Sequence, residues 1–269
     1  MPDNAPIITL LTDFGSQDAF VGIMKGVMLS ITPAVQFVDL SHEIPAQNIL
    51  AGALILRSAV RFFPPTTIHT AVVDPGVGSD RKGIVVETGH GIFVGPDNGL
   101  LSLAAPAASV QRITHVTNAA YFLDCPSPTF QGRDIFAPVA AHLAQGVEPT
   151  QLGPRLSSLE RLSVPVPVHT PERITGSVLY IDHFGNAITN ITPADLHLFS
   201  TQQLWVSINA QRIGRLATTY AAVAEGEAVA VINSWQQVEI AIRNGSAARA
   251  FKIEPGCRVE MTLVWPEPS

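Results

Sequence analysis

The sequence predicts an α/β domain with a mainly parallel sheet covered by helices, followed by a small all-β barrel domain. Three observations support this. In the first 160 residues, short apolar runs alternate with segments whose apolar residues recur at helical spacing. From residue 173 onward, only short strand-like runs separated by turns remain. Between them, residues 161–172 carry three prolines among valines, which indicates an extended linker. We therefore expect domains at residues 1–160 and 173–269.

The expected strands of the first domain are apolar runs bounded by turn-forming residues. They span residues 7–11, 35–40, 68–73, 83–87, 91–94 and 110–116. The run at 7–11 is apolar almost throughout, which is typical of a strand covered on both faces. Helices are expected at 20–31, 48–63 and 135–143, stopped by Pro33, by Pro64 and by Gly146 respectively. This alternation is the βαβ pattern of a sheet covered by helices.

The second domain is expected to consist of short strands. Its expected strands span residues 176–181, 204–208, 228–232, 238–242 and 258–264. Turns such as Glu225-Gly226-Glu227 and Asn244-Gly245 lie between them. Short strands separated by turns predict a small antiparallel barrel or a sandwich.

The composition restricts the kinds of partner. Only 14% of the residues are charged, against about 25% in ordinary soluble domains, which suggests that part of the surface is buried against other subunits. A net charge of −6 argues against a nucleic-acid or anionic-membrane partner. The apolar stretches are shorter than the ~20 residues that span a bilayer, and the first residues lack the positive segment of a signal peptide. Two distant cysteines fit a reduced compartment. We expect a soluble, cytoplasmic protein.

Several common catalytic motifs are missing. The sequence contains neither the GxxxxGK[ST] loop of nucleoside triphosphatases nor the GxGxxG turn of dinucleotide-binding domains. Its eight histidines form no HxH or HExxH pair, which argues against zinc, and it has no GxSxG elbow. We expect no metal and no cofactor.

The most informative segment runs from Asp74 to Arg81. An apolar strand ends on the Asp74 carboxylate, the chain turns through Gly76 and Gly78, and Arg81 follows seven residues later. Both glycines can adopt a positive φ without strain. The carboxylate and the guanidinium can therefore meet across the loop. A strand-end aspartate can also cap a following helix, and the segment alone leaves both interpretations open.

Further polar residues stand where ligands of α/β sheets bind, beyond the carboxyl ends of the strands. Asp13 follows the first strand, and its carboxylate could accept two hydrogen bonds from a ribose diol or cap a helix. Asp134 directly precedes a helix and is expected to be its N-cap. In the second domain, Asn186 belongs to a polar turn at residues 182–186; it could bind a purine edge or be an ordinary turn asparagine.

Taken together, five turns resemble those of one family. They are Thr12-Asp13-Phe14-Gly15, the Asp74 to Arg81 segment, Gly95-Pro96-Asp97-Asn98-Gly99, Gly132-Arg133-Asp134 and Asp182-His183-Phe184-Gly185-Asn186. In this order, over nearly the whole chain, they resemble the S-adenosylmethionine hydroxide adenosyltransferases. That family hydrolyses S-adenosylmethionine to adenosine and methionine and is related to the fluorinases and chlorinases. The resemblance implies a homotrimer, with active sites between the N-terminal domain of one subunit and the C-terminal domain of its neighbour.

The resemblance also implies substrate-binding residues. Asp13 would hold the ribose hydroxyls. The others lie in the second domain and would contact methionine (Asp182, Ser234), contact adenine (Phe184, Asn186) or offer backbone groups to the adenine edge (Ile242, Arg243, Asn244).

In the implied reaction, water or hydroxide attacks the ribose C5′ and displaces a neutral thioether. Asp74 could accept a hydrogen bond or a proton from the water, and Arg81 could stabilise the developing hydroxide. The family pattern leads us to expect a histidine before Gly132, but this chain has Gln131. An amide orients water but takes no proton. Losing a general base costs roughly 10²–10⁴-fold in rate, whereas a residue that only positions Arg81 or the water could be replaced by glutamine with little loss.

Three functions follow. Hydrolysis comes first, because Asp74 and Arg81 are both present. A protein that binds S-adenosylmethionine or adenosine with little turnover is the alternative that Gln131 suggests. Halogenation is disfavoured, because the negative charge of Asp74 would repel a halide ion.

Overall fold

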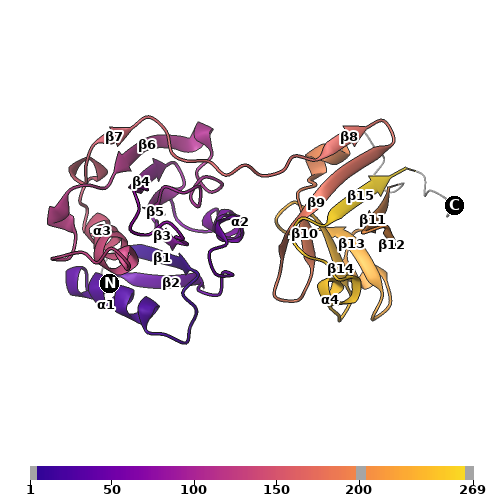
Figure 1. The fold of residues 1–269 in the computed structure, drawn as a ribbon, viewed down its shortest axis with the longest axis horizontal. Coiled ribbons are helices and arrows are strands. Elements are labelled where there is room, and N and C mark those ends of the chain that lie inside the picture. Colours follow the sequence, from indigo (N-terminus) through magenta and orange to yellow (C-terminus); the bar gives the residue numbers. More distant parts are fainter. Residues whose placement is uncertain (1–4, 198–203, 264–269) are drawn as a thin grey trace. The chain divides into compact units, whose positions relative to one another are not determined.

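The computed structural model describes residues 5–197 and 204–263. The chain divides into two compact units, residues 1–162 and 163–269 (Figure 1). Each unit is described by itself.

A seven-stranded sheet forms the centre of the first unit, in the order β2-β1-β3-β5-β4-β6-β7. The strands are β1 (Ile7–Thr12), β2 (Gln36–Ser41), β3 (Ile68–Val72), β4 (Gly83–Thr88), β5 (Gly91–Pro96), β6 (Val110–His115) and β7 (Arg155–Leu156). Strands β2, β1, β3 and β5 run parallel, whereas β4 pairs antiparallel with β5 and β6, and β6 with β7. Only two residues join β4 to β5, and so short a connection permits an antiparallel hairpin but no parallel crossover. The sheet is therefore mixed.

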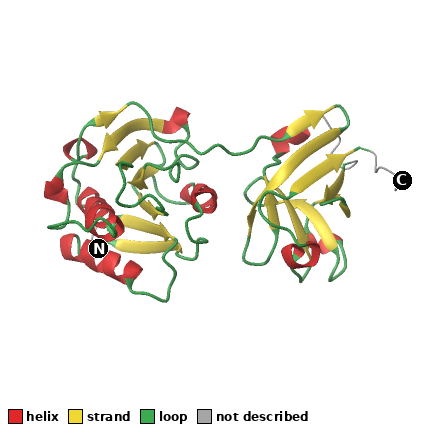
Figure 2. Cartoon of the chain, in the orientation of Figure 1, coloured by secondary structure: helices red, strands yellow, loops and turns green. Residues whose placement is uncertain are grey.

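Helices cover both faces of this sheet (Figure 2). They are α1 (Phe20–Ile31), α2 (Ile49–Val60) and α3 (Ala137–Ala144), with short 3-10 turns at Ala107–Ser109, Ala119–Tyr121 and Pro149–Gln151. Leu10 of β1 belongs to one core cluster with residues of α1 and α3. Its neighbour Leu11 points the other way, toward Gly52 of α2. The α/β prediction for this part of the chain is confirmed.

The second unit is a closed barrel. Its strands are β8 (Val168–Thr170), β9 (Arg173–Ile181), β10 (Ala187–Thr189), β11 (Trp205–Ile208), β12 (Gln211–Ala217), β13 (Ala228–Ile232), β14 (Val238–Ile242) and β15 (Arg258–Thr262). Strands β10-β14-β13-β12-β11-β15-β9 close on themselves, because β9 also pairs with β10, and β8 adds to β9. Every pair is antiparallel except β12 and β13. The unit also carries 3-10 turns at Pro193–Leu196 and Tyr220–Ala222 and the helix α4 (Ala247–Phe251).

The predicted barrel is confirmed, and closure excludes the sandwich. Strands β8, β10 and β12 were missed. Strand β8 lies within the expected linker 161–172 and pairs with β9, and both β8 and β10 have only three residues. Strand β12 carries polar residues and a glycine that hide its alternation. The expected last strand ends at Thr262 rather than 264, and residue 264 lies outside the described residues.

His69 in β3 makes the first unit sensitive to acid. Its ring lies between Phe63 and Phe93, and burial lowers its pKa from 6.5 to about 4. Nδ1 lies 2.8 Å from the Thr9 hydroxyl, while within the described residues Nε2 has no hydrogen-bond partner. At pH 5 the unfolded chain binds a proton at His69 that the folded chain excludes. The free energy of unfolding should therefore fall by about 2 kcal/mol between pH 7 and pH 5 from this residue alone.

The substitution His69→Asn should remove most of that pH dependence, because its amide oxygen can still meet Thr9 but does not titrate. Urea unfolding at both pH values measures it. His90→Asn, at an exposed position, is the matched control and should retain the full pH dependence. If the free energy of unfolding falls equally between pH 7 and pH 5 in His69→Asn and in the wild type, His69 is not the source of the pH dependence.

Candidate active site

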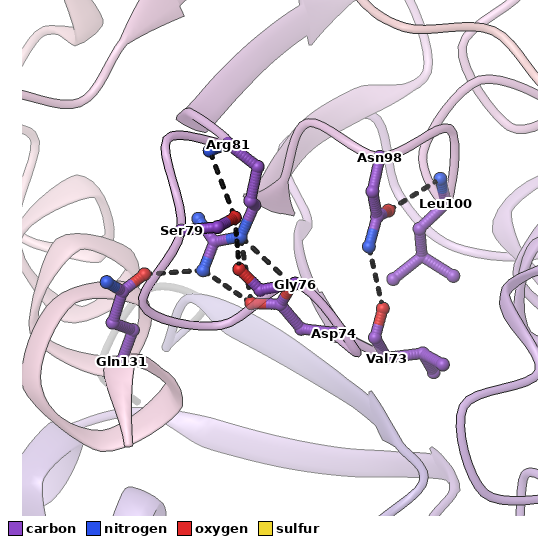
Figure 3. Close-up of polar contacts among 8 residues, drawn as sticks. All are labelled: Val73, Asp74, Gly76, Ser79, Arg81, Asn98, Leu100 and Gln131. Carbon is purple, nitrogen blue, oxygen red and sulfur yellow. Dashed lines mark hydrogen bonds and ion pairs between the residues drawn. The ribbon is translucent and has the colours of Figure 1, made fainter. Parts of the chain in front are cut away.

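The Asp74 carboxylate and the Arg81 guanidinium meet across the loop that follows β3 (Figure 3). Arg81 Nε donates to both carboxylate oxygens at 2.9 Å, and Nη2 donates to Oδ2 as well. The two side chains are only 5% and 11% exposed, so this ion pair is shielded from water. The chain continues from Asp74 through this loop to β4, so the carboxylate caps no following helix.

The loop itself is fixed by short-range contacts. Gly78 has φ +80°, and a Cβ there would lie 2.7 Å from the carbonyl oxygen of Pro128, so only glycine fits. Gly76, the other glycine of this loop, does not adopt a positive φ. The Ser79 hydroxyl donates to Gly76 O at 2.6 Å and accepts from the Arg81 amide at 3.3 Å. The orientation of the guanidinium is thereby set before any ligand arrives.

The Gly95–Gly99 turn supports the end of β3 from the neighbouring strand. Asn98 Nδ2 donates to Val73 O at 2.9 Å, and its Oδ1 accepts from the Leu100 amide at 3.1 Å (Figure 3). This motif of the sequence therefore positions the backbone directly before Asp74.

Gln131 completes the group. Arg81 Nη2 donates to Gln131 Oε1, across fifty residues of sequence. A guanidinium has only donors, so the amide oxygen of Gln131 must face it. The Nε2 amino group of Gln131 then points away from Arg81 and can only donate hydrogen bonds. Gln131 immediately precedes a π-helical turn, Gly132–Phe136. The structure brings Asp74, Arg81 and Gln131 together.

Asp134 is not the N-cap of α3, contrary to expectation. The helix begins at Ala137, and Asp134 lies in the π-helical turn before it. Its buried carboxylate accepts from the Ser127 amide at 2.8 Å and pairs with Arg133. Asp134 therefore joins the two ends of the 127–134 loop, and this loop contains Gln131.

Asp74 and Gln131 line a cavity of about 450 Å³ in the first unit. Phe14, Phe20 and Phe130 form an aromatic wall, with ring centroids 5.3–5.9 Å apart in edge-to-face contacts. The Asp74 carboxylate and three aromatic rings therefore line the same cavity.

Asp13 does not cap α1, since that helix begins at Phe20 after Ala19. Its Oδ2 accepts from the Gln47 amide at 2.8 Å. Whether this carboxylate also binds a ribose diol stays a prediction.

A second cavity of about 790 Å³ lies on the barrel. All seven residues of this unit that the resemblance implied line it: Asp182, Phe184, Asn186, Ser234, Ile242, Arg243 and Asn244. They come from the β9–β10 turn, the β13–β14 turn and the end of β14. The residues that the family resemblance implied thus come from three separate segments of the chain and line one cavity.

The β9–β10 turn is held by its own side chains. Asp182 accepts from the Asn186 amide at 2.8 Å and from Asn186 Nδ2 at 3.0 Å, so the aspartate orients the asparagine. Gly185 has φ +84°, and a Cβ there would lie 2.0 Å from the Ser246 hydroxyl. Between them Phe184 is 72% exposed and lines the cavity.

The main chain of Arg243 is partly engaged. Its amide donates to Glu227 O at 3.0 Å, and its carbonyl accepts from the Gly226 amide at 2.8 Å. The Arg243 amide is therefore engaged within the barrel, and its carbonyl oxygen keeps one lone pair beyond the contact with Gly226. The expected backbone contact with a ligand stays a prediction.

Sequence reasoning missed a polar cluster in the same cavity, formed by Tyr220, Asn233 and Glu239. Tyr220 Oη donates to Glu239 Oε1 at 2.7 Å, and Asn233 Nδ2 donates to Oε2 at 3.0 Å. Burial raises the pKa of Glu239, which is 3% exposed. The signal was a single carboxylate inside the apolar strand Val238–Ile242.

Residues 5–197 and 204–263 contain neither a membrane-spanning helix nor a cluster of metal-binding side chains. No helix there has the length and hydrophobicity to cross a membrane. In the same residues no three His, Cys, Asp or Glu side chains are grouped so as to hold a metal ion.

Comparison with known proteins matches both units. Residues 8–153 match the SAM hydroxide adenosyltransferase N-terminal domain, and residues 176–260 match the C-terminal domain of the same name. A protein of Salinispora tropica named (R)-S-adenosyl-L-methionine hydrolase is 38% identical over 96% of this chain and 98% of its own. A Thermus thermophilus protein of the same name is 35% identical over 94% and 98%. A fluorinase of Nocardia brasiliensis is 27% identical over 96% and 97%.

Among solved structures, an uncharacterized conserved protein from Thermotoga maritima superimposes with a TM-score of 0.89 at 36% identity, covering 95% of this chain and 99% of that one. A conserved hypothetical protein from Thermus thermophilus gives a TM-score of 0.76 at 34% identity, with the same coverage.

Proposed function

This chain belongs to the SAM hydroxide adenosyltransferase family, and on that premise we propose that it hydrolyses S-adenosyl-L-methionine to adenosine and L-methionine. The observation that carries the proposal is the shielded Asp74–Arg81–Gln131 group at the wall of an aromatic cavity. The oxygen of a water attacks the ribose C5′. The C5′–S bond breaks, its electron pair returns to sulfur, and the proton of the water is released.

The chemistry places its demand on the nucleophile. Sulfur leaves as a neutral thioether, so the leaving group needs no acid. The protein must instead hold an oxygen in line with the C–S bond and favour its hydroxide form in a site with little water.

Each of the three side chains has a distinct part in this. Gln131 Nε2 can donate to the attacking oxygen, because its own oxygen is engaged by Arg81. The Arg81 guanidinium supplies the positive charge that stabilises hydroxide. Asp74 holds that guanidinium with both oxygens and is the basic group through which the proton leaves.

Substrate contacts complete the proposal. Asp13 would hold the ribose diol, Asp182 and Ser234 the methionine end, and Phe184 and Asn186 the adenine. The cavity that the last four line supports this assignment. We further propose a cytoplasmic homotrimer in which subunits complete one another's sites, a proposal supported by the low content of charged residues.

Gln131 favours one second candidate, a protein that binds S-adenosylmethionine or adenosine with little turnover, because an amide accepts no proton. Halogenation is disfavoured despite the fluorinase relatives, since the Asp74 carboxylate lines the cavity where a halide would approach.

One assay separates these functions. Purified protein is incubated with S-adenosylmethionine, with and without chloride or fluoride, and adenosine, methionine and 5′-halo-adenosine are quantified. Adenosine and methionine should form in equal amounts regardless of halide, and Asp74→Ala should lower their rate by at least about 10²-fold. Tight binding without product over hours would support the binding protein instead. If Gln131→His leaves the rate unchanged, the glutamine is a full functional replacement.

A further inference from the structure

We propose that Glu239 is a positioning residue for substrate binding, which acts by fixing two turns that wall the cavity on the barrel. This inference rests on the proposed function, because it takes that cavity to bind the substrate.

Glu239 occupies an unusual place in its strand. Its neighbours in β14, Val238 and Ile240, point into the barrel core. Glu239 therefore points to the opposite face, where it lies beside Ile188 of β10 and Val231 of β13. It is 3% exposed, although it lines the cavity. A carboxylate in this position is unfavourable unless both oxygens are hydrogen-bonded, and both are.

The first partner, Tyr220, belongs to one segment of the cavity lining. Glu239 Oε1 accepts from Tyr220 Oη at 2.7 Å, and Tyr220 begins the 3-10 turn Tyr220–Ala222. Thr219, Tyr220 and Ala221 of this segment all line the cavity.

The second partner, Asn233, belongs to another segment of the cavity lining. Glu239 Oε2 accepts from Asn233 Nδ2 at 3.0 Å. Asn233 Oδ1 in turn accepts from the amides of Trp235 at 2.9 Å and Gln237 at 3.1 Å. The β13–β14 turn, with Ser234 and Trp235 on the cavity, is thus wound around the Asn233 side chain.

Charge makes this arrangement costly. Asp182 lines the same cavity, and its charge adds to burial in raising the pKa of Glu239 and of Tyr220. Arg243 and Arg249 are the other charged groups on the lining. An apolar residue facing apolar neighbours would serve folding as well. That both partners of this carboxylate are cavity walls argues for a role in binding.

The hydrogen-bond directions allow a sharp test. Glu239→Leu removes the acceptor of both Tyr220 and Asn233. Asn233 cannot turn over to compensate, because its Oδ1 already accepts two main-chain amides. Glu239→Gln is the matched variant, because its amide oxygen can accept from Asn233 Nδ2 while its amino group donates to the Tyr220 hydroxyl, which also accepts.

Steady-state kinetics with S-adenosylmethionine measures the effect. We expect Glu239→Leu to raise KM by about 10- to 100-fold with kcat within about threefold, and Glu239→Gln to keep KM within about threefold of the wild type. Glu225→Gln, an isosteric change at an exposed turn, should change neither constant. Thermal unfolding of each variant monitors stability separately.

The outcomes are decisive in either direction. An unchanged KM in a folded Glu239→Leu protein overturns the proposal. A Glu239→Gln protein that loses KM as fully as Glu239→Leu also overturns it, because the two hydrogen bonds would then not carry the effect. Calorimetric titration with S-adenosylmethionine gives the same comparison as Kd, so a wild type that binds without turnover refutes hydrolysis and still tests Glu239. A wild type that does not bind S-adenosylmethionine refutes both.

Discussion

Replacing Arg81 by lysine is expected to lower kcat for S-adenosylmethionine hydrolysis by about 10²–10³-fold while KM stays within about threefold. The guanidinium uses Nε and Nη2 on Asp74 and, through Nη2, also holds Gln131. A single ammonium on a flexible stem cannot hold both partners in one plane. The lysine variant keeps the charge, so it isolates the loss of geometry.

The matched control is Lys82→Ala, which removes the next positive charge along the chain from an exposed position. It should leave kcat unchanged. Near-normal kcat in Arg81→Lys would mean that charge alone suffices and that the planar contact to Gln131 has no part in the reaction.

Replacing Gly185 by alanine is expected to raise KM by about 10²-fold or more, with little change in the first unit. The added Cβ would lie 2.0 Å from Ser246 Oγ and 3.2 Å from its Cα, so α4 or the β9–β10 turn must move. The positive φ adds roughly 1 kcal/mol of backbone strain. Because Asp182, Phe184 and Asn186 share that turn, their common position on the cavity should be lost. Isothermal titration and steady-state kinetics both report it.

Gly226→Ala separates the two causes. Gly226 has a similar φ, +80°, but a Cβ there meets nothing within 4 Å. This variant should carry the strain without the collision and keep its KM. If both variants lose binding equally, strain alone accounts for the effect and the contact with Ser246 is irrelevant.

Much of the fold follows from local patterns. The apolar run at residues 7–11 and the helical spacing at 20–31 reappear as β1 and α1 because both are long and regular. The reversal of strand direction between β4 and β5 follows from their two-residue connection and not from the apolar pattern of either strand. The three-residue β10 closes the barrel through partners far along the chain, which a local pattern does not contain.

The candidate site divides in the same way. Contact between Asp74 and Arg81 was predictable because seven residues with two glycines form a closed loop. Gln131 lies fifty residues away, and only the family resemblance connected it to Arg81. No sequence motif indicated Glu239, because its partners Tyr220 and Asn233 lie in two turns that only the folded barrel brings next to its strand.

Closure of the barrel bears on self-association. Because β9 also pairs with β10, the described part of this sheet has no unpaired strand edge except along the three-residue β8. The open sheet of the first unit ends in β7, which has two residues, and in β2, where Asp39 carries an ion pair with Lys25. Short edges and a charged edge both discourage strand-to-strand growth between molecules. The architecture therefore guards a chain poor in surface charge against aggregation by edge pairing.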